Sequence, residues 1–460
     1  MNRYLSILIL LALPLVEAAG QRSREGTSPP GKSPDSLNIV MSDAYREIWN
    51  RQIQDKIDRD IGRYRKEEAH LVLEGIAGAA EVSIEQVSHS FLFGGNTFLY
   101  GDLKTPEKNK KYEDTFGKLF NAGTVSFYWK TLEPQWGKPR YQAGSSYEYR
   151  RPPTDPVVEF CESKGINMNG HAMIYGTRRW GHPGWMPENR KEMEAIFESH
   201  IRELAERYKG RIQRWDVVNE STDQANRGIM PDDYTYKSFL WAMKYFPDSV
   251  RLNINDSDMH WEMPLYRRYL EIVRNLIDRG IRINQVGLQM HIFNPKESRS
   301  IAEGADVLTP AKISERLDYM SDAGRPLQVS EVTVSAPDST NEGMWIQAAI
   351  TRNLYRLWFS HPNVKGITWW NVVDGGAASG EPSLSGIYDK ELKEKPVYNV
   401  LSQLINEEWQ TRLQTRTDKD GQVRFRGFKG KYVARWKDKN RQQREAAFEI
   451  GDGENKYFLK

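Results

Sequence analysis

The sequence is nearly free of cysteine, with Cys161 as its single copy in 460 residues. One cysteine cannot form an intramolecular disulfide, so the fold must be held together by its buried core. Hydrophobic residues make up 39% and aromatic residues 11% of the chain, which is enough for one large core or two moderate ones. A small disulfide-stapled fold is therefore excluded.

The chain is also poor in long hydrophobic runs. The run at the N-terminus, residues 4–16, follows the positive Arg3 and precedes the small residues Ala18 and Ala19. It is too short to span a bilayer, and this layout is typical of a secretory signal peptide. We expect residues 1–19 to be the signal, which predicts a secreted or periplasmic protein without stable membrane association. An uncleaved membrane anchor is the alternative.

A strong bias of charge is missing as well. The formal net charge is +3 with 28% charged residues, and the basic and acidic side chains are interspersed. Surfaces that bind nucleic acid or membranes carry blocks of like charge, so we expect neither partner. There is no P-loop, no dinucleotide glycine fingerprint and no Ser-His-Asp context, and we expect no cofactor.

The sequence does contain a regular alternation of short apolar β-like runs and helical stretches, the pattern of a parallel sheet with crossover helices. Eight β-like runs predict an α/β fold of the (β/α)8 TIM barrel type over residues 90–409. The runs lie at residues 91–97, 123–129, 167–175, 212–219, 250–255, 285–291, 327–330 and 366–373. The clearest helical stretches are residues 191–208, 264–279, 314–323, 344–359 and 397–409.

Smaller segments flank the predicted barrel. Residues 20–40 are rich in Ser, Pro, Gly and charge without periodicity, which predicts a disordered linker. Residues 41–89 combine a helical pattern with two strand-like runs, which predicts an N-terminal helix and a β-hairpin. Residues 410–460 have turn and strand signals without helices and predict a small β appendage that packs against the barrel. Sugar binding by this appendage is the alternative.

Polar residues close several of the predicted strands. In a TIM barrel the C-terminal strand ends form the active site, and two of these runs lead into Glu220 and Glu331. Two convergent carboxylates can perform general acid–base chemistry or glycosidic cleavage without a cofactor. Other polar or aromatic residues near strand ends are His171, Gln289, His291 and Trp370. Since His291 lies on the strand before that of Glu331, it is placed to donate a hydrogen bond to that carboxylate.

These motifs occur in the order found in a known family. Trp215-Asp216-Val217-Val218-Asn219-Glu220 resembles the acid/base strand of glycoside hydrolase family 10, the xylanase family. The further landmarks are Gly170-His171, Asn255-Asp256, Gly287-Leu288-Gln289-Met290-His291, Glu331, the stretch from Gly366 to Asp374, and Lys395-Pro396-Val397-Tyr398.

The resemblance implies that Glu220 is the acid/base and Glu331 the nucleophile of a retaining mechanism with a covalent glycosyl-enzyme. It implies that Asn219 binds the 2-hydroxyl of the sugar in the cleavage subsite. Its further implications are that Gln289 and His291 position Glu331, that His171 lines the glycone side, and that Trp370 stacks beneath a sugar ring. The implied function is endo-1,4-β-xylanase, acting as a monomer on a plant-type polysaccharide or oligosaccharide.

The sequence departs from the family on the glycone side. The family's second strand carries Glu-Asn-Glu-Met-Lys-Trp, whose Asn and Lys hold the sugar one step beyond the cleavage site. Here Val125 and Tyr128 stand at the Asn and Lys positions, and Tyr175-Gly176 replaces a Trp-His pair. Tyr128 and Tyr175 are therefore candidate substrate-binding residues. Loss of the usual polar groups predicts weak activity on plain xylan or a preference for another β-linked glycan.

Two further departures lie near the predicted carboxylates. Thr333 stands where the family has an Asp two residues after the nucleophile, which predicts that His291 is less firmly oriented. Small residues at 375–379 replace the second aromatic residue of the eighth-strand loop, which predicts an open glycone side.

The residues leave alternatives open. One is a retaining glycosidase for another β-linked glycan, and another is a non-catalytic carbohydrate-binding protein on the same barrel. The presence of both carboxylates with Gln289 and His291 argues against the binder. Asp256, Asp258 and His260 suggest a metal site, but ligands in a short strand-end loop are usually satisfied locally, so we expect no metal.

Overall fold

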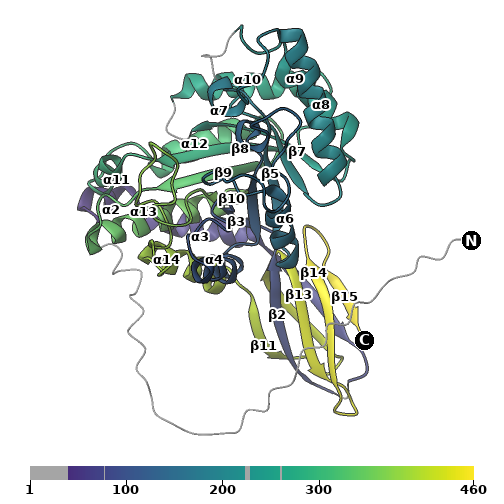
Figure 1. Cartoon of the computed structure of the whole chain (residues 1–460). Helices are drawn as coiled ribbons and strands as arrows, with labels where there is room; N and C mark the ends of the chain where they lie inside the picture. The colour runs from purple at the N-terminus through teal and green to yellow at the C-terminus, as the bar shows by residue number, and fades with distance from the viewer. Residues whose placement is uncertain (1–39, 77, 223–227, 259–261) are drawn as a thin grey trace, which may run out of the picture.

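The computed structural model describes residues 40–76, 78–222, 228–258 and 262–460 of the chain (Figure 1). The predicted signal peptide and the linker up to residue 39 lie outside the described residues, as do His260 and the side chain of Asp258. Within the described part, no helix is long and apolar enough to cross a membrane.

Eight parallel strands close into a barrel in the order β10-β3-β4-β5-β6-β7-β8-β9. The strands are β3 (Leu92–Asn96), β4 (Ala122–Ser126), β5 (Asn167–Tyr175), β6 (Arg214–Asn219), β7 (Arg251–Asp258), β8 (Gln285–Ile292), β9 (Leu327–Val334) and β10 (Val364–Trp369). Each coincides with one of the eight predicted runs, so the predicted (β/α)8 barrel is confirmed.

The second run was predicted to continue to Trp129, but β4 ends at Ser126. Aromatic residues favour strands, so the composition of Phe127-Tyr128-Trp129 is that of a strand. Instead Trp129 begins a short helix, α5 (Trp129–Leu132), and stacks on His200 with ring centroids 3.7 Å apart. The aromatic run therefore turns outward at the C-terminal end of the barrel.

The remaining barrel helices are α4 (Pro106–Leu119), α6 (Thr154–Ser163), α7 (Arg178–Gly181), α8 (Arg190–Tyr208), α9 (Tyr234–Tyr245), α10 (Met263–Asp278), α11 (Pro295–Ala302), α12 (Pro310–Ser321), α13 (Asn341–Ser360) and α14 (Pro396–Gln403), the last followed by a π-helical turn (Leu404–Glu408). Side-chain caps start several of them. Thr105, Asn189 and Thr340 each accept a hydrogen bond from a backbone N–H of the first turn.

Two N-terminal helices pack beside the barrel. They are α2 (Asp43–Ile48) and α3 (Arg51–Arg65), which Asn50 caps. Asp58 of α3 pairs with Arg356 of α13 at 2.6 Å. The helix predicted over this region is thus present as two pieces, with the break at Trp49 and Asn50.

The β-hairpin predicted after these helices is wrong. Strands β1 (Lys66–Leu73) and β2 (Glu81–His89) lie in different sheets and do not pair with each other. Their alternating apolar residues identify a buried face but not a partner strand. The partners come from the C-terminal segment: β1 lies between β12 and β15, and β2 lies between β11 and β13.

The N-terminal and C-terminal appendages therefore form one small β-domain, seen below the barrel in Figure 1. Its C-terminal strands are β11 (Arg412–Arg416), β12 (Gln422–Phe428), β13 (Gly430–Lys437), β14 (Gln443–Ile450) and β15 (Lys456–Leu459). Leu71 and Ile84 from the early strands share a buried core with Tyr432 and Ile450 from the late ones. Neither segment has this core without the other.

The β-domain joins the barrel at the N-terminal strand ends, away from the strand ends that lead into Glu220 and Glu331. Trp409 stacks on Phe359 and Phe93 at centroid distances of 4.1 and 5.6 Å. Arg65, buried at the end of α3, donates from Nε to the Phe359 carbonyl at 2.5 Å and from Nη2 to the Val364 carbonyl at 2.8 Å. Burial lowers the pKa of Arg65 to about 9. These contacts tie the two parts into one structure.

We predict that removal of residues 411–460 destabilises the whole chain rather than trimming an independent module. The truncation leaves β1 and β2 without partners, and each apolar side chain returned to water costs about 1.5–3 kcal/mol. The expected result is insoluble protein or a much lower Tm, measured by thermal unfolding. Phe458→Ala is the control, because this side chain is 60% exposed and its loss leaves Tm unchanged. A truncated chain that unfolds at the full-length temperature would contradict the shared core.

Candidate active site

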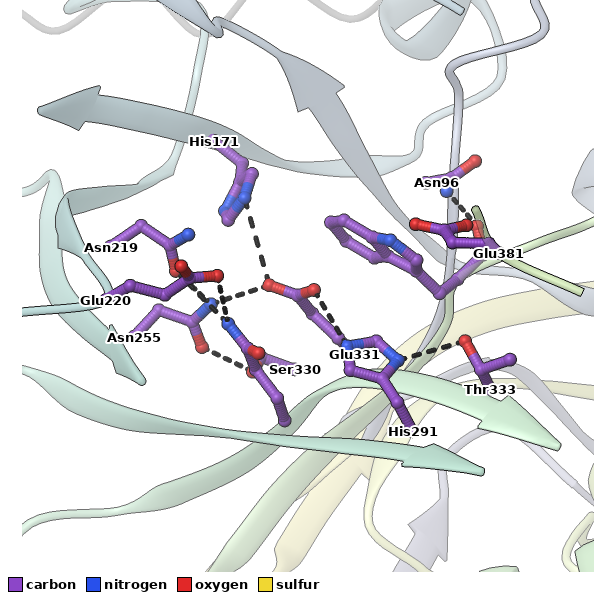
Figure 2. Close-up of polar contacts among 12 residues, drawn as sticks. Asn96, His171, Asn219, Glu220, Asn255, His291, Ser330, Glu331, Thr333 and Glu381 are labelled. Atoms are coloured by element: carbon purple, nitrogen blue, oxygen red, sulfur yellow. Dashed lines mark hydrogen bonds and ion pairs between the residues drawn. The ribbon is translucent and has the colours of Figure 1, made fainter. Parts of the chain in front are cut away.

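The C-terminal strand ends bring all of the proposed site residues together. Figure 2 shows Glu220, which follows β6, and Glu331 of β9 with their carboxyl groups directed toward each other. The surrounding side chains are Tyr128 after β4, His171 and Tyr175 of β5, Asn219 of β6, Gln289 and His291 of β8, and Trp370 after β10.

Glu331 is buried, with 5% of its surface exposed, and donors lie against both of its carboxylate oxygens. Asn255 Nδ2 donates to Oε1 at 2.8 Å, and His291 Nε2 lies 3.2 Å from Oε2. His171 Nε2 is 3.8 Å from Oε1. These contacts fix the orientation of the carboxylate and leave it accepting on both sides.

His291 is held by Thr333, the residue that replaces the family's Asp. Its Nδ1 lies 2.9 Å from Thr333 Oγ1, and its ring stacks on Phe293 with centroids 4.4 Å apart. Thr333 therefore gives His291 a contact at the position of the missing Asp, which the sequence did not predict. A hydroxyl can donate to Nδ1 of a neutral imidazole, which keeps the ring proton on Nε2, facing Glu331. An aspartate can only accept at this position.

Glu220 occupies a different environment. Tyr175 donates its hydroxyl to Glu220 Oε1 at 2.5 Å, and Gln289 Nε2 donates to the same oxygen at 3.4 Å. Burial, together with the charges of Asp256 and Glu331, raises the pKa of Glu220 to about 7, against the opposite effect of the two hydrogen bonds. This carboxyl group is therefore poised to exchange a proton near neutral pH.

Two residues contact partners that the sequence did not indicate. Tyr175 was proposed to bind substrate, but its hydroxyl is engaged by Glu220. The resemblance implied that Gln289 positions Glu331, whereas it donates to Glu220 and, at 3.5 Å, to Asn219 Oδ1. Both side chains therefore contact Glu220 rather than Glu331.

An amide network links the two carboxylate-bearing strands. Asn255 Nδ2 donates to Asn219 Oδ1 at 2.8 Å as well as to Glu331, and Ser330 Oγ donates to Asn255 Oδ1 at 2.5 Å. The bonds to Asn219 Oδ1 turn its amide nitrogen away from this network. Asn255 had no assigned role from sequence and Ser330 was missed, although each lies at a strand end that the motifs marked.

His171 is held by Asp216, for which the sequence predicted no role. Nδ1 lies 2.8 Å from Asp216 Oδ2, which also accepts from Asn169 at 2.7 Å. Burial opposes the charged form, but the hydrogen bond to Asp216 and the nearby Glu331 raise the pKa of His171 overall. Nε2 is buried without a hydrogen-bond partner among the described residues. A sugar hydroxyl bound beside Glu331 would satisfy it.

The segment with the small residues 375–379 contacts another loop. The long loop after α5 crosses to this segment: Tyr149 donates to the Gly375 and Ala377 carbonyls at 3.3 and 3.1 Å. Arg150 pairs with Glu381 at 3.2 Å and donates to Asn371 Oδ1 at 3.0 Å. Charged groups thus link the two loops, which are far apart in the sequence.

Trp370 packs between His171 and Phe98. Its ring makes edge contacts with His171 and Phe98 at centroid distances of 5.4 and 5.1 Å, and it is 5% exposed. Asn96 donates to its backbone carbonyl. The arrangement holds the indole against the catalytic cluster.

Asp256 braces the segment that follows Glu220. Its carboxylate accepts from Thr222 N at 2.6 Å, from Thr222 Oγ1 at 2.7 Å and from Ser221 Oγ at 3.1 Å. Within the described ranges, no group of three or more His, Cys, Asp or Glu side chains could hold a metal ion.

Comparison with known proteins agrees with this geometry. The family model of glycosyl hydrolase family 10 matches residues 90–404, well over half of the chain. Endo-1,4-beta-xylanase B of Thermotoga neapolitana is 24% identical over 323 residues, which cover 66% of this chain and 86% of that protein. Beta-1,4-xylanase of Dictyoglomus thermophilum is 27% identical over 289 residues, covering 57% of this chain and 74% of that protein.

Among solved structures, native xylanase 10B from Thermotoga maritima superposes with a TM-score of 0.57. The match covers 69% of this chain and 96% of that one at 20% identity, which supports the barrel fold. With the family match across the whole barrel and both carboxylates at its strand ends, the chain belongs to glycosyl hydrolase family 10 and is a retaining glycoside hydrolase.

Proposed function

We propose that the protein is an endo-acting β-1,4-glycanase of the xylanase type, with Glu220 as acid/base and Glu331 as nucleophile. The observation that carries this assignment is the contrast between the two carboxyl groups. Glu331 faces donors at both oxygens, whereas the pKa of Glu220 is raised to about 7. Relatives named as xylanases that match across most of their length support the substrate class. A non-catalytic binder would need neither environment.

In the first step, protonated Glu220 donates its proton to the glycosidic oxygen while Glu331 attacks the anomeric carbon. The carbon–oxygen bond to the leaving sugar breaks, and an ester bond to Glu331 forms. Asn219 Nδ2 and His171 Nε2 can bond to hydroxyls of the sugar in this subsite, and such hydrogen bonds strengthen in the transition state.

In the second step, Glu220 acts as a base and removes a proton from water, which attacks the anomeric carbon and releases Glu331. Esterification removes the charge of Glu331, one of the groups that raise the pKa of Glu220. The pKa of Glu220 therefore falls when the intermediate forms, which favours its role as base.

Substitution of each carboxylate separates the two roles. Glu331→Ala should lower kcat on xylan roughly 10⁴-fold or more, because no covalent intermediate can form. Glu220→Ala should lose activity on xylan but still form the intermediate from an aryl glycoside whose leaving group needs no proton. Glu271→Ala, an exposed carboxylate on α10, serves as the control and should match wild type. Unchanged hydrolysis by Glu331→Ala would remove the assignment.

Tyr175→Phe should move the alkaline limb of the kcat/KM profile to higher pH by about one pH unit. The first step needs protonated Glu220, so activity falls as pH rises through the pKa of this group. The Tyr175 hydroxyl stabilises ionised Glu220, and a hydrogen bond to a charged group contributes about 1.5–3 kcal/mol. Tyr128→Phe is the matched control and should leave the limb in place. A limb that stays or moves to lower pH in Tyr175→Phe would contradict this role.

We also propose that the enzyme is exported and acts as a monomer. Support for export comes from the N-terminal layout of residues 1–19. N-terminal sequencing of protein recovered outside the cytoplasm should find a chain that begins after Ala18 or Ala19. A chain that keeps Met1 would contradict cleavage, and a dimer mass in light scattering would contradict the monomer.

A further inference from the structure

Arg151 is a cation at the glycone end of the site to which the proposed mechanism gives no role. Its guanidinium carbon lies 3.9 Å from the centre of the Tyr128 ring and 4.9 Å from that of Phe98. Nη1 donates to the Arg150 carbonyl at 2.9 Å. Among the described residues, no carboxylate forms an ion pair with it.

The neighbouring arginines of the same loop make their contacts within the protein. Arg150 pairs with Glu381. Arg140 is buried and donates to the Ser146, Thr131 and Arg151 carbonyls at 2.7, 3.0 and 2.9 Å. The last bond fixes the backbone at Arg151, so its side chain is presented from a braced loop.

The Tyr128 ring lies between Arg151 and the side chains that contact Glu331 and Glu220. The ring that Arg151 covers packs on His171 and Tyr175, at centroid distances of 5.3 and 5.7 Å. Those two side chains reach Glu331 and Glu220 respectively. Since Tyr128 stands where the family has a glycone-binding Lys, Arg151 returns a positive charge to this side of the cleavage site.

There is space beside Arg151 for a ligand group. With Tyr100, Asp102 and Tyr147 it lines a pocket of about 280 Å³. Two carboxylates also line this pocket, Asp102 and Glu148, and Asp102 accepts a hydrogen bond from Arg150 N at 3.0 Å.

Burial lowers the pKa of Arg151, and the nearby charge of Glu381 opposes this without forming an ion pair with it. The planar fork of an arginine matches a carboxylate with two parallel hydrogen bonds. A neutral sugar offers only hydroxyl groups, whereas a uronic acid offers this carboxylate.

We propose that Arg151 recognises the carboxylate of a uronic acid that the substrate carries on the glycone side. The preferred substrate is then an acidic, uronic-acid-bearing β-1,4-xylan rather than the plain polymer. This inference rests on the proposed function and names the substrate class of the same site. It agrees with the weak activity on plain xylan that Val125 and Tyr128 predict.

The test is binding by the full chain carrying Glu331→Gln, which prevents turnover. One ligand is a β-1,4-xylo-oligosaccharide with a single glucuronic acid branch, and the other is the same oligosaccharide with the carboxyl group reduced to an alcohol. Calorimetry should give a Kd about tenfold lower for the acidic ligand. Adding Arg151→Met should abolish this ratio, and Arg151→Lys should keep part of it.

Arg63→Met is the matched control, since Arg63 also covers a tyrosine ring, that of Tyr64, but on α3. It should leave the ratio unchanged. Equal affinity for the two ligands, no binding of either, or a ratio that survives Arg151→Met overturns the role of Arg151. Wild-type protein that prefers the acidic ligand but cleaves no β-1,4-xylo-oligosaccharide contradicts the proposed function alone. Cleavage without charge discrimination contradicts the Arg151 inference alone.

Discussion

The hydrogen bonds of Asn255 hold the two halves of the active site in register. Its side-chain amide donates to both Asn219 and Glu331, and its backbone carbonyl accepts from Glu220 N at 2.9 Å. The neighbouring strand leaves room for it only because residue 287 is glycine, where an added Cβ would lie 2.2 Å from Asn255 Oδ1. One side chain on β7 thus links Asn219 of β6 to Glu331 of β9. Proton transfer and attack depend on this coupling, because both must reach one anomeric carbon.

The carboxyl groups of Glu220 and Glu331, on either side of Asn255, have different neighbours. Glu331 accepts from Asn255 and faces His291, whose Nδ1 contacts the Thr333 hydroxyl. Glu220 is buried, and among the described residues Tyr175 and Gln289 donate to its Oε1. A pair of identical residues thereby performs opposite tasks. The same loops that complete the site also place charge on its glycone side, where the family uses amide, ammonium and aromatic groups.

The barrel and the convergence of Glu220 and Glu331 could be predicted from sequence because both leave local signals. Alternating β-like and helical runs mark the strands, and Glu220 and Glu331 stand where strands end. The predicted hairpin of β1 and β2 was wrong because an alternation of apolar and polar residues shows which face of a strand is buried but not which strand pairs with it. The contacts of Tyr175, Thr333 and Arg150 could not be predicted, since each depends on how a loop or neighbouring strand folds back. The pairing of Arg150 with Glu381 joins residues far apart in the chain, and no pattern records it.

The central claim is that Glu331 forms a covalent bond to the sugar. The most direct measurement is mass spectrometry after treatment with a 2-deoxy-2-fluoro xylobioside carrying a good leaving group, which slows hydrolysis of the intermediate. The account predicts a protein heavier by one fluorinated xylobiosyl group, with the adduct on the peptide that contains Glu331. An adduct on another residue, or turnover of the reagent without any adduct, would contradict it.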